Sequence, residues 1–188
     1  VLSAPGYSDA DLSLTSLYDE VHKLMSRQYC RRLGRDLRVL SDDAAMGLSG
    51  RVAAMLCEIG WRGMQAGVVM MSGVDIASWL GAAGLYGDCV SVWSELREFG
   101  MLVQADGDVN DPLSCNYHFL HLTLQEYYGG KRVAASLSGV NALSAGDGEW
   151  LLLNKYGMRL EVMWWFAGGL IGEAVVGSGD RRGLDGLL

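Results

Sequence analysis

The 188-residue chain lacks the motifs that nucleotide hydrolysis and metal binding require. None of its lysines ends a G-x-x-x-x-G-K-[ST] phosphate-binding loop, and there is no G-x-S-x-G nucleophile motif. The four cysteines form no C-x-x-C pair, and no histidine stands at ligand spacing from them. We therefore expect no metal site, and no enzymatic activity from this chain by itself.

Positive charge and long apolar runs are also scarce. The chain has 15 Lys and Arg against 22 Asp and Glu, a net charge of -7, which disfavours nucleic-acid binding because phosphate backbones are repelled. The longest apolar run covers residues 162–172 and is too short for the roughly 20 residues that span a bilayer. Residues 1–6 do not resemble a signal peptide. We expect a cytoplasmic protein with reduced cysteines and no membrane span.

Basic residues are concentrated in one short segment, residues 23–38, which holds six Lys and Arg against one Asp. Cations near the end of a helix interact favourably with the helix dipole, so a solvated helix end explains the segment. A docking patch for an acidic partner explains it as well. The sequence leaves both interpretations open.

Half of the residues are hydrophobic and only two are prolines, which favours a folded, helix-rich chain. Apolar spacing predicts helices over residues 14–34, 44–60, 72–80, 88–100, 123–137 and 159–172. Asp42 or Asp43 is expected to cap the second helix and Gly60 to end it, while Asp88 is expected to cap the fourth. Residues 139–148 are expected to form a loop.

Two predicted strands, residues 101–104 and 117–120, flank a turn-rich segment at 106–112. Helices followed by a hairpin and one more helix indicate a winged helix. A DNA-binding winged helix is basic in its hairpin, but no Lys or Arg lies between Arg97 and Lys131. DNA binding through this hairpin is therefore disfavoured.

The expected fold is mainly α: a winged-helix-like helical domain with one β-hairpin, flanked by helices of adjoining helical domains. We predict a linker over residues 1–12 and a helical segment over 13–40 that leads into the winged helix. The winged-helix domain itself is predicted over 41–138, and a second helical domain is predicted to start in 139–188.

The most informative segment is residues 117–128 (YHFLHLTLQEYY). Thr123 and Glu126 match a capping box, and Leu122 and Tyr127 stand where a hydrophobic staple would. The helix would thus start just beyond the strand, with His121 at the junction. A neutral histidine there can donate a hydrogen bond to a phosphate oxygen placed before the helix. A lone histidine is also often structural, so spacing alone leaves its role open.

Residues 119–127 (FLHLTLQEY) resemble the F-x-H-x-[ST]-x-Q-E-[FY] segment of NACHT-type NTPases, the NOD-like receptors and their STAND relatives. In that family the segment closes the winged-helix domain. Residues 14–21 (LTSLYDEV) resemble the helix that precedes the winged helix, and residues 160–170 (LEVMWWFAGGL) resemble a helix of the second helical domain. The matches occur in the family's order.

The resemblance implies a non-catalytic switch module of a signalling protein, such as one of innate immunity. In the family, ADP lies between the nucleotide-binding and winged-helix domains, and the motif histidine, here His121, contacts the β-phosphate. Thr123, Gln125 and Glu126 would support the helix start beside it. Exchange of ADP for ATP releases the winged helix, and the protein oligomerises.

The resemblance also implies where the nucleotide comes from. ADP or ATP would be held by a nucleotide-binding domain of the same parent protein, outside this chain, and that domain would be its main partner. The alternative function is a stand-alone acidic protein–protein interaction domain with no nucleotide role, in which Trp164 and Trp165 dock a partner. The same tryptophan pair also suits a helix core.

One departure from the family pattern concerns glycine. Gly129-Gly130 follow the motif where relatives carry a pair such as Ala-Ala, and Gly168-Gly169 raise the same question. Because glycine costs a helix interior about 1 kcal/mol relative to alanine, the pairs need a reason. Close helix packing is one, and a loosened hinge is the other.

Overall fold

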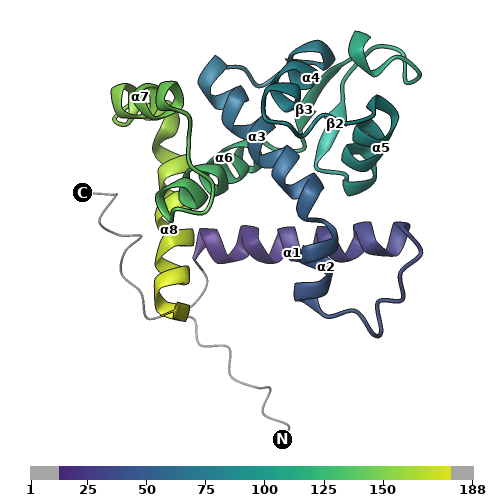
Figure 1. Cartoon of the computed structure of the whole chain (residues 1–188), viewed down its shortest axis with the longest axis horizontal. Coiled ribbons are helices and arrows are strands. Elements are labelled where there is room, and N and C mark those ends of the chain that lie inside the picture. Colours follow the sequence, from purple (N-terminus) through teal and green to yellow (C-terminus); the bar gives the residue numbers. More distant parts are fainter. Residues whose placement is uncertain (1–12, 179–188) are drawn as a thin grey trace, which may run out of the picture.

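The computed structural model describes residues 13–178, and the predicted linker 1–12 lies outside the described residues. The protein is mainly helical with a small antiparallel sheet, as expected from the sequence (Figure 1). The elements are α1 (Leu14–Arg32), α2 (Asp42–Leu48), α3 (Gly50–Ala66), β1 (Met71–Ser72), α4 (Gly73–Ala82), α5 (Cys89–Phe99), β2 (Leu102–Gln104), β3 (Asn116–Phe119), α6 (Leu122–Leu137), α7 (Ala145–Asn154) and α8 (Glu161–Ser178), with 3-10 turns at Pro112–Ser114 and Met158–Leu160.

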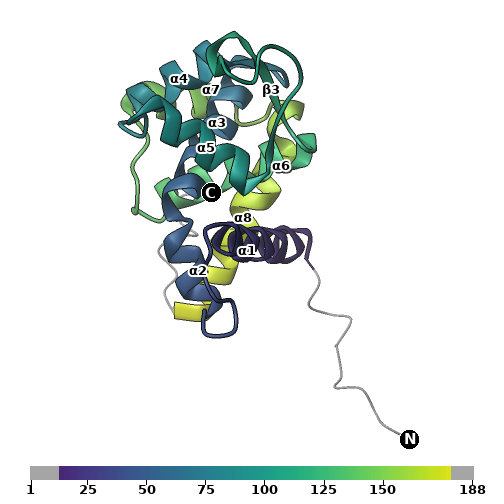
Figure 2. The same cartoon turned by 90° about the vertical axis from the view of Figure 1, so that its right-hand side faces the viewer.

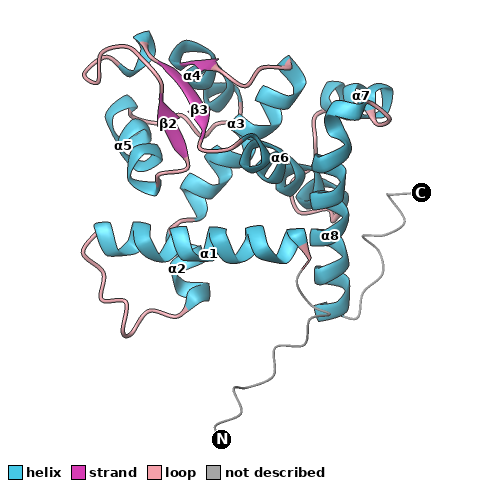
Figure 3. Ribbon diagram, turned by 180° about the vertical axis from the view of Figure 1, so that it is seen from behind, coloured by secondary structure: helices cyan, strands magenta, loops and turns pink. Residues whose placement is uncertain are grey.

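The segment from α3 to β3 has the topology of a winged helix. Helix, strand, two helices and a hairpin follow one another, and the sheet order is β1-β3-β2, with both pairs antiparallel. Leu102 pairs with Phe119 in the hairpin, and Met71 pairs with Tyr117 at the other edge. Figure 3 shows the strands beside α4 and α5. The predicted hairpin is confirmed, whereas the short strand β1 was not expected from the sequence.

Three helices outside this unit hold it in place. Helix α6 leaves the end of β3 and packs against α3 and α8. Helix α1 lies below α6 in Figure 1 and contacts α8, which runs past its first turns (Figures 1 and 2). Two buried apolar clusters result. One lies within the winged helix and against α1, and the other fills the space between α3, α6, α7 and α8. Helices α3 and α6 contribute to both clusters and so join them.

Glycines lie where these helices come closest. A Cβ atom on Gly60 would stand 2.8 Å from the carbonyl oxygen of Gln125, and one on Gly130 would stand 2.9 Å from that of Met163. Gly169 faces the side chain of Thr15 in the same way. Such distances leave no room for a side chain. Close packing therefore explains Gly130 and Gly169, while Gly129 has ordinary clearance, with Met64 Cγ at 3.5 Å.

The expected end of the second helix at Gly60 is wrong. The predicted helix is two helices that break at Ser49, and α3 continues through Gly60 to a left-handed Gly67, with φ of 71°. Glycine normally ends a helix because it accepts that backbone conformation, but Gly60 instead makes room for α6. The cap is also different, because Ser41 accepts the amide of Ala44.

Other local predictions are confirmed. Asp88 caps α5 by accepting the amides of Val90 and Ser91, and Gly100 ends that helix in the left-handed conformation. The loop expected over 139–148 is correct only up to Ser144, because Ser144 caps helix α7 by accepting the amide of Asp147. Helix α7 has few buried residues, so its sequence carries a weak periodic signal.

The basic segment 23–38 is largely engaged within the protein. Arg27 donates to Asp42 and to backbone carbonyls, Arg32 donates to the carbonyl of Glu98, and Arg38 pairs with Asp36. Arg31 and Arg35 are exposed. The contacts of Arg27 and Arg38 tie the α1–α2 loop together, and that of Arg32 joins α1 to α5, which favours a structural role for most of the charge in this segment.

Within residues 13–178, no helix is both long enough and apolar enough to cross a membrane.

Candidate functional site

The motif residues lie where β3 passes into α6. The Leu120 amide donates a hydrogen bond to the carbonyl of Met101, which ends the hairpin. His121 is the residue immediately before α6. Leu120, His121 and Leu122 are all exposed, so the junction is open to solvent. The position predicted for His121, between strand and helix, is therefore confirmed.

His121 itself caps α6. Its Nδ1 accepts a hydrogen bond from the Thr123 amide at 3.2 Å and lies 2.8 Å from the Thr123 hydroxyl. Because Nδ1 accepts the amide proton, the neutral ring carries its proton on Nε2. No hydrogen-bond partner of Nε2 is found among residues 13–178. The ring is thus held by one nitrogen and offers an N–H donor with the other.

The predicted capping box is wrong. Thr123 is the second residue of the helix rather than its cap, so its hydroxyl supports the imidazole and Glu126 does not reach back. The staple is absent as well, because Leu122 is an exposed first residue of α6 while Tyr127 is wholly buried. A histidine cap was missed because Ser, Thr, Asn and Asp are the usual capping residues.

Gln125 and Glu126 have different surroundings. The Gln125 amide is buried and donates to the carbonyl of Val68 at 2.8 Å, which ties α6 to the loop after α3. Its Oε1 atom is buried without a hydrogen-bond partner in the described part of the chain. Glu126 is half-buried, and burial raises the pKa of its carboxyl, whereas the nearby His121 acts in the opposite direction.

The next residues of the motif anchor α6 to α1. The Tyr127 hydroxyl donates to Asp19 at 3.0 Å, and Lys131 donates to both groups. Burial would raise the pKa of Asp19, but the Lys131 charge and these hydrogen bonds outweigh it and lower the pKa. A half-buried carboxylate and ammonium are thus paired between the two helices.

A buried histidine strengthens the same contact. His22 Nδ1 and the Tyr128 hydroxyl form a hydrogen bond of 3.0 Å, and His22 is only 2% exposed. Burial, together with the charge of Lys131, lowers the pKa of His22 to about 3, so the ring is neutral at physiological pH. Sequence reasoning missed this pair because its members lie 106 residues apart.

A second polar network links α7 to α3. Arg62 donates to Asp147 at 2.6 Å and to Glu58 at 2.8 Å, and Gln65 also donates to Asp147. Burial would raise the pKa of Asp147, but hydrogen bonds from Gln65, Ser144 and Arg62 reverse that effect and lower it. The network is structural, since every one of its charged groups is paired.

Two hollows of the surface lie away from this junction. One of about 360 Å³ includes Cys57 and Lys131, and one of about 400 Å³ lies between α3 and α7. His121 lines neither of them. Among residues 13–178, no group of His, Cys, Asp and Glu is arranged to hold a metal ion. The exposed ring of His121 offers a single donor at an open surface.

Trp164 and Trp165, the pair considered as a docking site from the sequence, lie in different environments. Trp164 packs against the cluster between α6, α7 and α8, whereas Trp165 is 61% exposed. The core interpretation therefore holds for Trp164, and Trp165 is available at the surface.

Comparison with known proteins yields no match: no family model, no curated protein and no solved structure is significantly similar to this chain.

Proposed function

We propose that this chain is a non-catalytic switch module of a NACHT-type NTPase in the cytoplasm. In this proposal a nucleotide-binding domain of the same parent protein holds ADP or ATP, and His121 contacts the phosphates from the winged-helix side. Loss of that contact releases the module and permits oligomerisation and signalling. The resemblance of residues 119–127 to the family motif is the reason for naming this class.

The observation that carries the proposal is the state of the His121 ring. It is exposed, its Nδ1 is occupied by Thr123, and its neutral tautomer presents Nε2–H as a donor at the start of α6. A phosphate oxygen accepts such a hydrogen bond, and the helix start adds a favourable dipole. The residues therefore fit one phosphate contact, while the remaining contacts would come from the nucleotide-binding domain. In this proposal a phosphate oxygen of ADP accepts the hydrogen bond from Nε2 of His121.

The winged-helix topology supports the same proposal, because the motif follows the last strand of the winged helix, as in the family. The acidic character of helix α5 and of the hairpin argues against DNA as the partner. Asp106, Asp108 and Asp111 lie in the hairpin loop, and Arg51 is already paired with Glu95 of α5.

The test uses the intact parent protein and two variants of one residue. His121→Ala removes both the cap and the Nε2 donor, whereas His121→Asn keeps a capping oxygen but has no donor at the position of Nε2, because its amide N–H group lies on a shorter side chain. We expect purified wild-type protein to carry ADP and both variants to lose most of it, measured by chromatography of the released nucleotide. Basal oligomerisation should rise in parallel.

Two results would contradict the proposal. Wild-type protein that contains no nucleotide would exclude the switch role altogether. Full ADP occupancy in His121→Asn would show that Nε2 makes no contact, even if the alanine variant is unstable.

A second candidate function is a stand-alone acidic protein–protein interaction domain without a nucleotide role. The exposed Trp165 favours it, because exposed tryptophans are enriched at interaction sites. A parent protein without a phosphate-binding loop would favour this function over the switch.

A further inference from the structure

A surface cavity of about 400 Å³ lies between the end of α3, helix α7 and the turn before α8. We call it the α3–α7 cavity. Met64 and Leu160 form buried parts of its wall, and Trp150 packs edge-on against Trp61 at 5.4 Å between ring centres. This volume lies in the range of small ligand pockets and suits one or two apolar side chains.

Three polar side chains line the cavity, and two of them form hydrogen bonds with other groups of the chain. Gln65 donates to Asp147 and accepts from Arg62, and the Asn154 amide donates to the carbonyl of Trp150. Arg159 is the third. No ion pair of Arg159 occurs within the described part of the chain, so its guanidinium is the one charged group in the lining without a partner.

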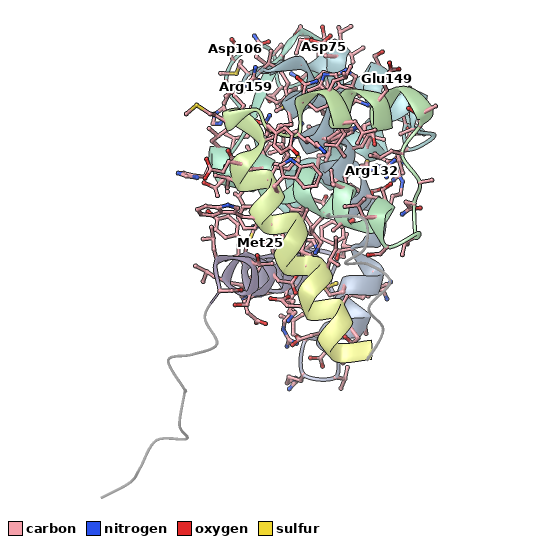
Figure 4. All side chains as sticks on the ribbon, turned by 90° about the vertical axis from the view of Figure 1, so that its left-hand side faces the viewer. Met25, Asp75, Asp106, Arg132, Glu149 and Arg159 are labelled. Atoms are coloured by element: carbon pink, nitrogen blue, oxygen red, sulfur yellow. The ribbon has the colours of Figure 1, made fainter. Side chains whose placement is uncertain are left out.

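Arg159 lies at the carboxyl end of α3. Its guanidinium lies against Gly67, where a Cβ atom would stand 2.6 Å from one guanidinium nitrogen. Gly67 also has a left-handed backbone and ends α3, whose carboxyl end favours a cation. Figure 4 shows Arg159 where α8 begins and Glu149, the exposed acid of α7, well away from it.

Exposed apolar side chains also lie along the chain segment that borders the cavity. Residues 152–158 contain four large apolar side chains that solvent reaches, among them Tyr156 and Met158, which are 89% and 90% exposed. Met158 also lines the cavity. Exposed apolar groups beside a pocket are typical of protein interaction sites.

We infer that the α3–α7 cavity binds a short peptide segment of a partner protein, one that presents a carboxylate next to an apolar side chain. The carboxylate pairs with Arg159, which matches its fork of donors, while the apolar side chain enters between Met64 and Trp150. The neighbouring acids do not take this role, since Glu149 and Glu161 are exposed and unpaired with Arg159. The inference is independent of the nucleotide role of His121.

The experiment measures binding of two matched peptides to the full chain. The probes are acetyl-Glu-Leu-Leu-amide and its neutral counterpart acetyl-Gln-Leu-Leu-amide, titrated against protein labelled with ¹³C at the methionine methyl groups. We expect the acidic peptide to shift the Met64 and Met158 signals and to bind about fivefold more tightly, which is the effect of one accessible ion pair.

Two arginine variants separate the cavity from general charge. Arg159→Gln should abolish the preference for the acidic peptide, while Arg97→Gln, at another exposed and unpaired arginine, should leave it unchanged. Equal binding of both peptides to wild-type protein, or no shift at millimolar concentration, would overturn the inference. N-acetylleucine binding as tightly as the peptide would overturn it too, since the site would then recognise small carboxylates.

Discussion

The two halves of the motif around α6 lie in opposite surroundings, although they are continuous in sequence. Leu120, His121 and Leu122 at the start of the helix are exposed, whereas Tyr127 and Tyr128, little more than one turn later, are wholly buried. In the exposed half, the side chain of His121 makes a local contact with Thr123. The buried half makes long-range contacts to α1 and α8.

This difference separates two roles within one pattern. The buried half holds α6 at a defined angle between α1, α3 and α8, and its substitution should change stability. The exposed half is presented by that scaffold, and its substitution should change contacts with another molecule rather than the fold. A binding residue placed on a rigid element keeps its position, which a single-donor contact requires.

The largest expected effect on stability lies in the buried half, where substitutions of two adjacent glycines should have different results. Gly130→Ala should lower the free energy of unfolding by about 2–3 kcal/mol, because its methyl group would press against Met163 and Phe166. Gly129→Ala should be neutral or stabilise by up to about 1 kcal/mol, since its nearest neighbour leaves ordinary contact distance. Urea unfolding of both variants measures the difference, and equal effects would refute close packing as the reason for Gly130.

The pH dependence of stability tests the buried histidine. The pKa of His22 is about 3 in the folded protein, against about 6.5 in an unfolded chain. Between these values only the unfolded chain binds the proton, so the contribution of His22 is complete above pH 6.5 and falls as the pH drops. At pH 5 the loss should be about 2 kcal/mol.

His22→Gln is the matched variant, because it keeps a polar group near Tyr128 but does not titrate. Unfolding by urea at pH 7 and pH 5 should show a smaller decrease in stability for the variant than for wild type. Asp19 and Asp147 contribute little to this difference. Their pKa values are lowered in the folded protein, so their stabilisation begins to be lost only when the unfolded chain is protonated, near the ordinary aspartate pKa of about 4. The same decrease in both proteins would mean that His22 is accessible to solvent.

The smallest effect is expected at the exposed end. His121→Ala should cost about 1 kcal/mol, the typical value of a lost helix cap, and His121→Asn only a few tenths. Thermal unfolding of the isolated chain measures both. A loss well above 1 kcal/mol in either variant would indicate that His121 belongs to the core and would remove the contrast between the two halves.

Much of the local structure follows from residues that are close in sequence. Asp88 and Gly100 delimit α5 as expected, and Gly34 follows the end of α1 with a φ of 75°. The helix–hairpin–helix order of the winged helix could also be predicted. The exact start of α6 could not, because a histidine took the capping role that the pattern assigned to Thr123.

The apolar stripe of α1 shows where prediction from periodicity ends. Leu14, Leu17 and Leu24 fit the expected apolar face but are exposed, while His22 and Ser26 are buried. The buried His22 and Ser26 of α1 bond to Tyr128 and Ser49, which lie far along the chain, so the burial of these two residues depends on distant polar groups. A hydrophobic pattern cannot report a polar partner on another element.

The sequence by itself determined the helical class, the hairpin and most helix ends, because caps, turns and periodicity act between residues a few positions apart. The tertiary structure decided which glycines lie where two helices are in close contact. It also decided which histidine is buried, which is exposed, and that Arg159 lines a cavity. Those outcomes depend on contacts between segments that are distant in the chain, where packing and desolvation rather than local propensity set the free energy.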